Sequence, residues 1–122
     1  MNNLIDEYIK LGIAHGEATL EGNSKYGNKI YSKMMKLIND IKLQTNDVKQ
    51  QFYDLMYHEN DSVKMWTAVT LVRTFEKEAL EVLKNIKDHN DTIIGFSAKT
   101  TIDVWKRGML TNQIDWNTLS NP

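Results

Sequence analysis

The feature that most constrains this chain is an internal repeat, because residues 52–72 return thirty positions later as residues 82–102. Asp-Ser-Val at 61–63 matches Asp-Thr-Ile at 91–93, and Trp-Thr-Ala at 66–68 matches Phe-Ser-Ala at 96–98. A fixed period of this length is typical of helical repeat proteins, whose units bury their apolar faces by stacking on one another. We therefore expect an all-α fold of stacked antiparallel helical hairpins, forming a short α-solenoid.

Nothing in the interior of the chain forbids helices, since its single proline is the last residue, Pro122. The spacing of apolar residues predicts six helices, at about 3–20, 24–42, 48–58, 62–74, 76–88 and 92–107. Gly22 and Gly108 are expected to end the first and sixth helices, because glycine adopts the left-handed conformation without a Cβ clash. Asp61 and Asp91 are expected to cap the fourth and sixth helices.

The predicted organisation is a single domain over residues 1–122. A divergent N-terminal hairpin occupies 1–45, two repeats occupy 46–75 and 76–108, and an irregular tail occupies 109–122. The tail contains the apolar residues Ile114, Trp116 and Leu119. They either pack on the last hairpin, or the whole tail frays. In the second helix, Gly27 falls on the apolar face and is expected to allow close approach of a neighbouring helix.

The composition excludes several classes of site. Sixteen acidic residues face fifteen basic ones, so the net charge of −1 gives no general reason to expect nucleic acid or an anionic membrane. The absence of cysteine excludes disulfides, thiolate metal sites and a thiol nucleophile. Neither a signal-peptide pattern nor a run of ~20 apolar residues is visible. We expect a cytoplasmic protein, and the abundance of Asn, Lys and Ile hints at a bacterial source.

The second helix carries a basic stripe that falls within a sector of about 80°. The stripe consists of Lys25, Lys29, Lys33 and Lys36. It is either a solvated face or a docking strip for an acidic partner or a phosphate backbone. The helix lacks arginine, and its Tyr26 and Tyr31 are expected on or near the core face, so an acidic protein surface is favoured over nucleic acid.

The predicted fourth and sixth helices, which are the second helices of the two repeats, have similar residues at some positions and different residues along one side. Where they agree, for example at Trp66 and Phe96, we expect a shared packing plan. Where the sixth helix has Gly95, Lys99 and Asp103, the fourth helix has Met65, Val69 and Arg73. The fourth helix is therefore apolar almost all round. It is either a central helix covered by its neighbours or a contact patch in which Met65, Val69 and Arg73 meet a partner.

No constellation of catalytic or metal-binding residues is recognisable. His58 and His89 are expected at helix C-termini, where histidine interacts well with the helix dipole. His15 and Glu17 lie two apart in a helix, so they point about 200° away from each other and could not easily share a metal. Phosphate-binding loops, nucleophile elbows and zinc-helix motifs are absent. We expect neither enzymatic activity nor a cofactor.

The run Asp61-Ser62-Val63-Lys64, followed by Thr67, Ala68, Thr70 and Leu71, resembles the second helix of a HEAT repeat. The second copy is looser, with Ile94 where a basic residue is usual and Thr101 where leucine is usual. The stretch Ala14-His15-Gly16-Glu17-Ala18 is similar to part of a tetratricopeptide hairpin. Together these features resemble a bacterial family of small HEAT-like proteins, a domain of unknown function.

The resemblance implies a protein-interaction module and implies no catalytic residues. The favoured function is therefore a non-enzymatic module that binds another protein, and an immunity or antitoxin protein is one version of it. The alternative is a nucleic-acid-binding HEAT-like protein that uses the lysine stripe.

Overall fold

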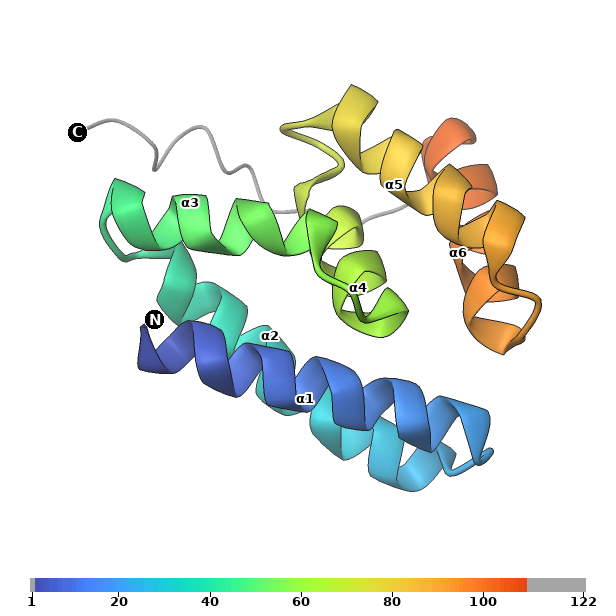
Figure 1. The fold of residues 1–122 in the computed structure, drawn as a ribbon, viewed down its shortest axis with the longest axis horizontal. Coiled ribbons are helices and arrows are strands. Elements are labelled where there is room, and N and C mark those ends of the chain that lie inside the picture. Colours follow the sequence, from blue (N-terminus) through green and yellow to red (C-terminus); the bar gives the residue numbers. More distant parts are fainter. Residues whose placement is uncertain (1, 110–122) are drawn as a thin grey trace.

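The computed structural model of the chain describes residues 2–109, which form six α-helices and one short 3₁₀ helix (Figure 1). These elements are α1 (Asn3–Leu20), α2 (Ser24–Lys42), α3 (Asn46–Asp54), η1 (Leu55–Tyr57), α4 (Asp61–Leu71), α5 (Glu76–His89) and α6 (Ile93–Lys106). The predicted packing of residues Ile114, Trp116 and Leu119 lies outside the described part. Within residues 2–109, no helix is long and apolar enough to cross a membrane.

The helices stack as antiparallel hairpins, which confirms the predicted fold class. Helix α1 pairs with α2, and α5 pairs with α6. Helix α4 joins the two hairpins because it packs against both α1 and α5. Figure 1 shows the α1–α2 hairpin along the bottom, α5 and α6 at the upper right, and α3 and α4 between them.

The ends of the helices follow the prediction in most places. Helices α1 and α2 have the predicted bounds. Gly22 and Gly108 have φ angles of 72° and 69°, which confirms that both adopt the left-handed conformation. The third helix ends as α at Asp54 and continues as the 3₁₀ helix η1, and α4 ends at Leu71 instead of near residue 74.

The predicted N-cap of α4 is wrong, because Asn60 caps this helix in place of Asp61. The side-chain oxygen of Asn60 accepts the backbone N–H groups of Ser62 at 3.0 Å and Val63 at 3.1 Å. The Asp61 carboxylate instead accepts a hydrogen bond from another part of the chain. Its Oδ2 atom accepts a hydrogen bond from Asn90 Nδ2 at 2.8 Å, and so ties α4 to the turn of the next hairpin.

The N-cap of α6 is also displaced by one residue from the prediction. Thr92, not Asp91, caps this helix, and its hydroxyl oxygen accepts the backbone N–H of Ile94 at 3.2 Å. The backbone N–H of Thr92 in turn donates to the side-chain oxygen of Asn90 at 2.9 Å. Asn90 therefore fixes the turn before α6, which places Thr92 at the cap.

The two repeat histidines both lie at helix ends, as predicted, but their side chains have different partners. His89 lies in the last turn of α5, with Nδ1 2.6 Å from the carbonyl oxygen of Asn85, as predicted. Its Nε2 atom lies 2.9 Å from the Asp61 carboxylate. His58 also lies at a helix end, as the C-cap residue of η1, but its Nδ1 accepts the backbone N–H of Asn60 in the following turn at 3.0 Å.

Large apolar side chains from all six α-helices form one core. Tyr8 of α1 and Phe52 of α3 are fully buried, and their rings pack edge to face with centroids 4.9 Å apart. The Tyr8 hydroxyl lies 3.1 Å from the hydroxyl of Thr67 on α4. Burial raises the pKa of Tyr8, because ionisation would place a charge in this core. The N-terminal hairpin is therefore packed directly on the repeats.

Close approach of helices occurs at α1, not at Gly27 as predicted. A Cβ atom at Gly27 would meet only ordinary contacts, 3.9 Å from Ala18 Cβ and from His15 Nε2. A Cβ atom at Gly16 would lie 2.7 Å from Ser62 Cβ, and one at Gly12 would lie 3.0 Å from a Val63 methyl group. Gly12 and Gly16 are four residues apart on one face. They allow α1 to approach α4 closely.

The shared packing plan of the two repeats is only partly confirmed. Ala98 is fully buried, like its counterpart in the first repeat. However, Phe96 is 65% exposed and Ile93 is 51% exposed, whereas Trp66 is half-buried and Val63 is fully buried. The difference follows from position in the stack: α4 lies between α1 and α5, while α6 is the last helix of the described part.

Candidate functional site

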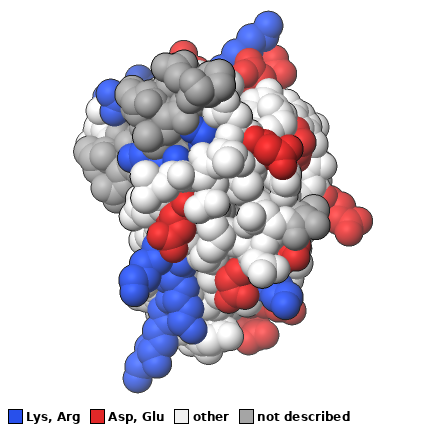
Figure 2. All heavy atoms as spheres, turned by 90° about the vertical axis from the view of Figure 1, so that its left-hand side faces the viewer, with Lys and Arg blue, Asp and Glu red and all other residues white. Residues whose placement is uncertain are grey.

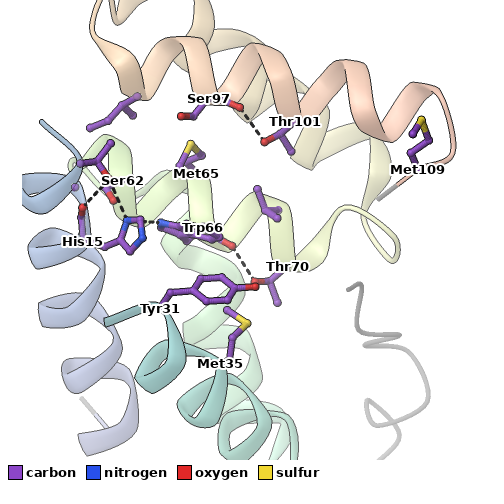
Figure 3. A pocket seen from close by; sticks show the side chains of 14 residues that line it. His15, Tyr31, Met35, Ser62, Met65, Trp66, Thr70, Ser97, Thr101 and Met109 are labelled. Carbon is purple, nitrogen blue, oxygen red and sulfur yellow. Dashed lines mark hydrogen bonds between the residues drawn. The ribbon is translucent and has the colours of Figure 1, made fainter. Parts of the chain in front are cut away.

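A cavity of about 340 Å³ opens where the N-terminal hairpin faces α4 and α6 (Figure 3). Four helices build it. Helix α1 supplies His15, α2 supplies Tyr31, α4 supplies Trp66, and α6 supplies Ser97, together with further side chains from each helix. Helices far apart in the sequence meet here because Gly12 and Gly16 bring α1 close to α4.

Two of the predicted partner-binding residues line this cavity. Met65 is nearly buried and Val69 is half-buried, and both lie on the wall that α4 contributes. The side of α4 that is apolar only in the first repeat is therefore covered by neighbours and also lines an internal space. Arg73, the third residue of that prediction, is exposed beyond the end of α4 and does not line the cavity.

The lysine stripe lies on a different surface. Lys25, Lys29, Lys33 and Lys36 are all exposed on α2, and none forms an ion pair within residues 2–109. Figure 2 shows basic side chains gathered at the lower left of the molecule, where α2 lies. The stripe is roughly 130° around α2 from Tyr31 and Met35, which line the cavity. The structure therefore separates the predicted binding residues into two sites.

His15 and Trp66 form a hydrogen-bonded pair in the cavity wall. The indole N–H of Trp66 donates to His15 Nδ1 at 3.3 Å, and the two rings meet nearly at right angles with centroids 5.0 Å apart. Because an indole nitrogen can only donate, His15 Nδ1 carries no proton and the neutral ring is protonated on Nε2. Burial lowers the pKa of His15, which also favours the neutral ring.

Because His15 must be neutral to accept the Trp66 N–H, we expect the stability of the folded protein to depend on pH. The unfolded chain has a histidine pKa near ~6.5, and the pKa of His15 in the folded protein is lower. Between the two values the unfolded state binds more protons, so stability is complete above the unfolded pKa and is lost as pH falls toward the folded pKa. The expected loss is about 1 kcal/mol, the size of one hydrogen bond.

Urea denaturation of wild type and His15→Gln at pH 7.5 and pH 5.0 measures this effect. Glutamine cannot titrate but can still accept the Trp66 N–H, and the other two histidines contribute equally to both proteins. We expect wild type to lose more stability than the variant between the two pH values. Equal losses would show that His15 titrates as it does in the unfolded chain.

The described lining carries no acidic, lysine or arginine side chain. Ser62 Oγ is buried and has no hydrogen-bond partner among the described residues. A nucleophilic serine needs a base within hydrogen-bond reach, and His15 Nδ1 is already engaged with Trp66. Within residues 2–109, no group of three His, Asp or Glu side chains is arranged to hold a metal ion.

The sequence predicts one wall of the cavity and not the others. In the sequence, His15 stands out only beside Glu17, as a fragment of a metal motif, and Tyr31 only as a residue near the core face. No sequence pattern marks Ser97 or Thr101 as site residues. The available signals were the two glycines four apart in α1 and the two hydroxyl residues four apart in α6, because each pair falls on one helix face.

A family model described as a domain of unknown function (DUF2019) matches residues 2–105. No curated protein and no solved structure matches the chain.

Proposed function

This chain belongs to the DUF2019 family, a domain of unknown function, and we propose that it is a non-enzymatic protein-interaction module. In this proposal, an uncharged side chain of a partner protein anchors in the cavity between the hairpins. The observation that supports it most is the lining of the cavity, which combines apolar and hydroxyl side chains and has no charged residue within the described part.

The character of the α4 wall also supports a binding role. Met65 and Val69 lie beside Trp66, and Met35 faces the same space from α2. Methionine adapts its shape to a guest, and buried pockets of this kind hold the anchor residues that supply most of the binding energy in protein interfaces. A charged anchor is disfavoured, because the described lining offers it no partner.

The wider setting of the proposal comes from the repeat pattern. We propose that the stack is HEAT-like. We also propose that the protein acts in the bacterial cytoplasm, because a chain without cysteine does not depend on disulfides, which the reducing conditions there prevent. An immunity or antitoxin protein, which would hold a toxin through the anchor, is one version of this function.

The proposal is tested by quantitative affinity purification from cells of the source organism. We compare wild type with Val69→Lys, with Val69→Ile, and with a variant in which the four stripe lysines become glutamate. Lysine is the residue at the equivalent position of the second repeat, and it would introduce a charge at the wall of the cavity. Circular dichroism establishes that each variant is folded.

We expect a specific partner whose recovery falls at least about tenfold with Val69→Lys, a loss of about 1.4 kcal/mol. Recovery is expected to be unchanged with Val69→Ile and with the stripe variant. Recovery that depends on the stripe and is indifferent to Val69→Lys would overturn the cavity proposal and move the binding site to the outer face of α2.

A second candidate function is nucleic-acid binding, favoured by the four exposed lysines that have no ion pair within residues 2–109. We expect no binding of duplex DNA at ~50 mM salt, where counterion release makes any such affinity greatest. Fluorescence anisotropy with a labelled duplex measures it. Binding with a logarithmic salt slope of about −3 to −4, abolished by the stripe variant, would instead support this candidate.

A further inference from the structure

From the cavity lining we infer that its guest is a neutral aromatic ring that carries one hydrogen-bond donor, such as a phenol or an indole. The inference rests on the proposed function, in which this ring is the tyrosine or tryptophan side chain of a partner protein.

The absence of charge in the described lining requires a neutral guest. The titratable lining residues are His15 and Tyr31. His15 is held neutral by the Trp66 N–H. A carboxylate, phosphate or ammonium group would lose its hydration on entering and find no opposite charge among these residues.

The packing of the aromatic side chains favours a ring over an aliphatic chain. Trp66 meets Tyr31 at a centroid distance of 5.3 Å and an interplanar angle of 53°, and it meets His15 nearly at right angles. Figure 3 shows these three side chains on one side of the cavity, with Met35 beside them. Aromatic rings attract one another in tilted and edge-to-face arrangements, and thioether sulfur adds favourable contacts with ring edges.

The hydroxyl groups of the lining threonines call for a donor on the guest. Each of them donates its proton to a carbonyl oxygen of its own helix, one turn away. Thr19 donates to His15 at 2.9 Å, Thr70 to Trp66 at 2.8 Å, and Thr101 to Ser97 at 2.9 Å. A hydroxyl that has given its proton retains only acceptor lone pairs.

The donors of the lining are largely committed as well. The Trp66 N–H already serves His15. The remaining fixed N–H, on His15 Nε2, lies beside a glycine of α2 that does not line the cavity. The hydroxyls of Tyr31, Ser62 and Ser97 can serve in either role, and that of Ser62 has no partner among the described residues. The described lining therefore has more fixed acceptors than fixed donors that face the cavity. A phenol O–H or an indole N–H matches this surplus. An ether or an N-methyl group of the same shape has no proton to donate and leaves these acceptors without a partner.

The size of the cavity limits the guest to one or two rings. A cavity of about 150 Å³ holds benzene, and this cavity has about 340 Å³. It therefore lies at the lower end of the roughly 300–1,000 Å³ typical of small-molecule sites. A phenol or an indole fits, and a nucleotide-sized cofactor exceeds it.

The inference is tested with matched probes, titrated into the whole protein and followed by NMR at the Trp66 indole N–H. The donor-bearing probes are p-cresol and 3-methylindole, and their methylated counterparts without a donor are 4-methylanisole and 1,3-dimethylindole. 4-Methylbenzoate is the charged control. We expect each donor-bearing probe to bind about 3- to 10-fold more tightly than its methylated counterpart, and 4-methylbenzoate not to bind. Val69→Lys is expected to weaken all binding, whereas the variant with glutamate at the four stripe lysines, which lie outside the cavity, is not.

Equal affinity for the donor-bearing and methylated probes, preferential binding of the benzoate, or no binding of any ring would overturn the inference. N-acetyltyrosinamide, which carries the ring on a peptide backbone, separates this outcome from failure of the proposed function. If p-cresol binds but N-acetyltyrosinamide does not, the ring chemistry holds and a partner's side chain cannot be the source. If neither binds although Val69→Lys abolishes partner recovery, the proposed function holds and the ring chemistry is wrong.

Discussion

Replacing Gly95 by alanine is expected to destabilise the protein by roughly 3 kcal/mol, at the upper end of the range for overpacking. Gly95 lies buried in the first turn of α6. A Cβ atom there would lie 1.8 Å from the carbonyl oxygen and 2.9 Å from the carbonyl carbon of Asn90. These are backbone atoms, so the clash can be relieved only by moving the turn between α5 and α6.

That turn is poorly able to move. The Asn90 side chain donates to Asp61 and accepts the backbone N–H of Thr92. Shifting Asn90 would therefore strain the link to α4 and the start of α6 together. For a chain of this size, a 3 kcal/mol loss corresponds to a decrease in Tm of roughly 10–15 °C, which thermal unfolding followed by circular dichroism measures directly.

Gly27→Ala is the matched control, since Gly27 is also a buried glycine inside a helix. A Cβ atom there meets only atoms at 3.9 Å. Alanine also has the higher helix propensity, by about 1 kcal/mol. We expect unchanged or slightly increased stability. Similar Tm decreases for both variants would contradict the close approach of Gly95 to the turn.

Phe52→Ala is expected to cost about 3–5 kcal/mol, because it removes a fully buried ring and leaves a cavity in the core. Phe52 packs edge to face on Tyr8, so the substitution acts at the contact between α3 and the N-terminal hairpin. A loss of this size is comparable to the lower end of the roughly 5–15 kcal/mol that stabilises a typical domain. Urea denaturation measures it as a lower midpoint.

Phe96→Ala makes the same chemical change on the surface of α6, where the ring is 65% exposed. We expect its effect to stay within about 0.5 kcal/mol. A large loss at Phe96 would mean that this face of α6 is covered in solution, as the repeat comparison had predicted. The ratio of the two losses therefore tests the difference in burial between the two phenylalanine side chains.

Much of the fold could be predicted from the sequence because it depends on local periodicity. The bounds of α1 and α2 and the left-handed glycines at 22 and 108 follow from apolar spacing and from the conformational freedom of glycine. The N-caps were less predictable. Asn60 and Asp61 are both good caps, and the bond between Asp61 and Asn90, twenty-nine residues away, decides between them.

The candidate site was predictable on one wall only. Comparing the repeats identified the apolar side of α4, where Met65 and Val69 line the cavity. The opposite walls carry His15, Tyr31 and Ser97, whose separation in the sequence gives no sign that they meet. Their meeting depends on the close packing of α1 against α4 at Gly12 and Gly16.

By itself, then, the sequence determined the helical hairpins and the repeat, since these follow from interactions between residues a few positions apart. The tertiary structure decided which repeated positions are buried, because burial depends on what lies on each side of a helix: Trp66 has neighbours in α1 and α2, whereas Phe96 is largely exposed. It also decided that the lysine stripe and the α4 side belong to separate sites, because the stripe faces away from the cavity around α2. Both decisions require contacts between distant segments, which periodicity does not encode.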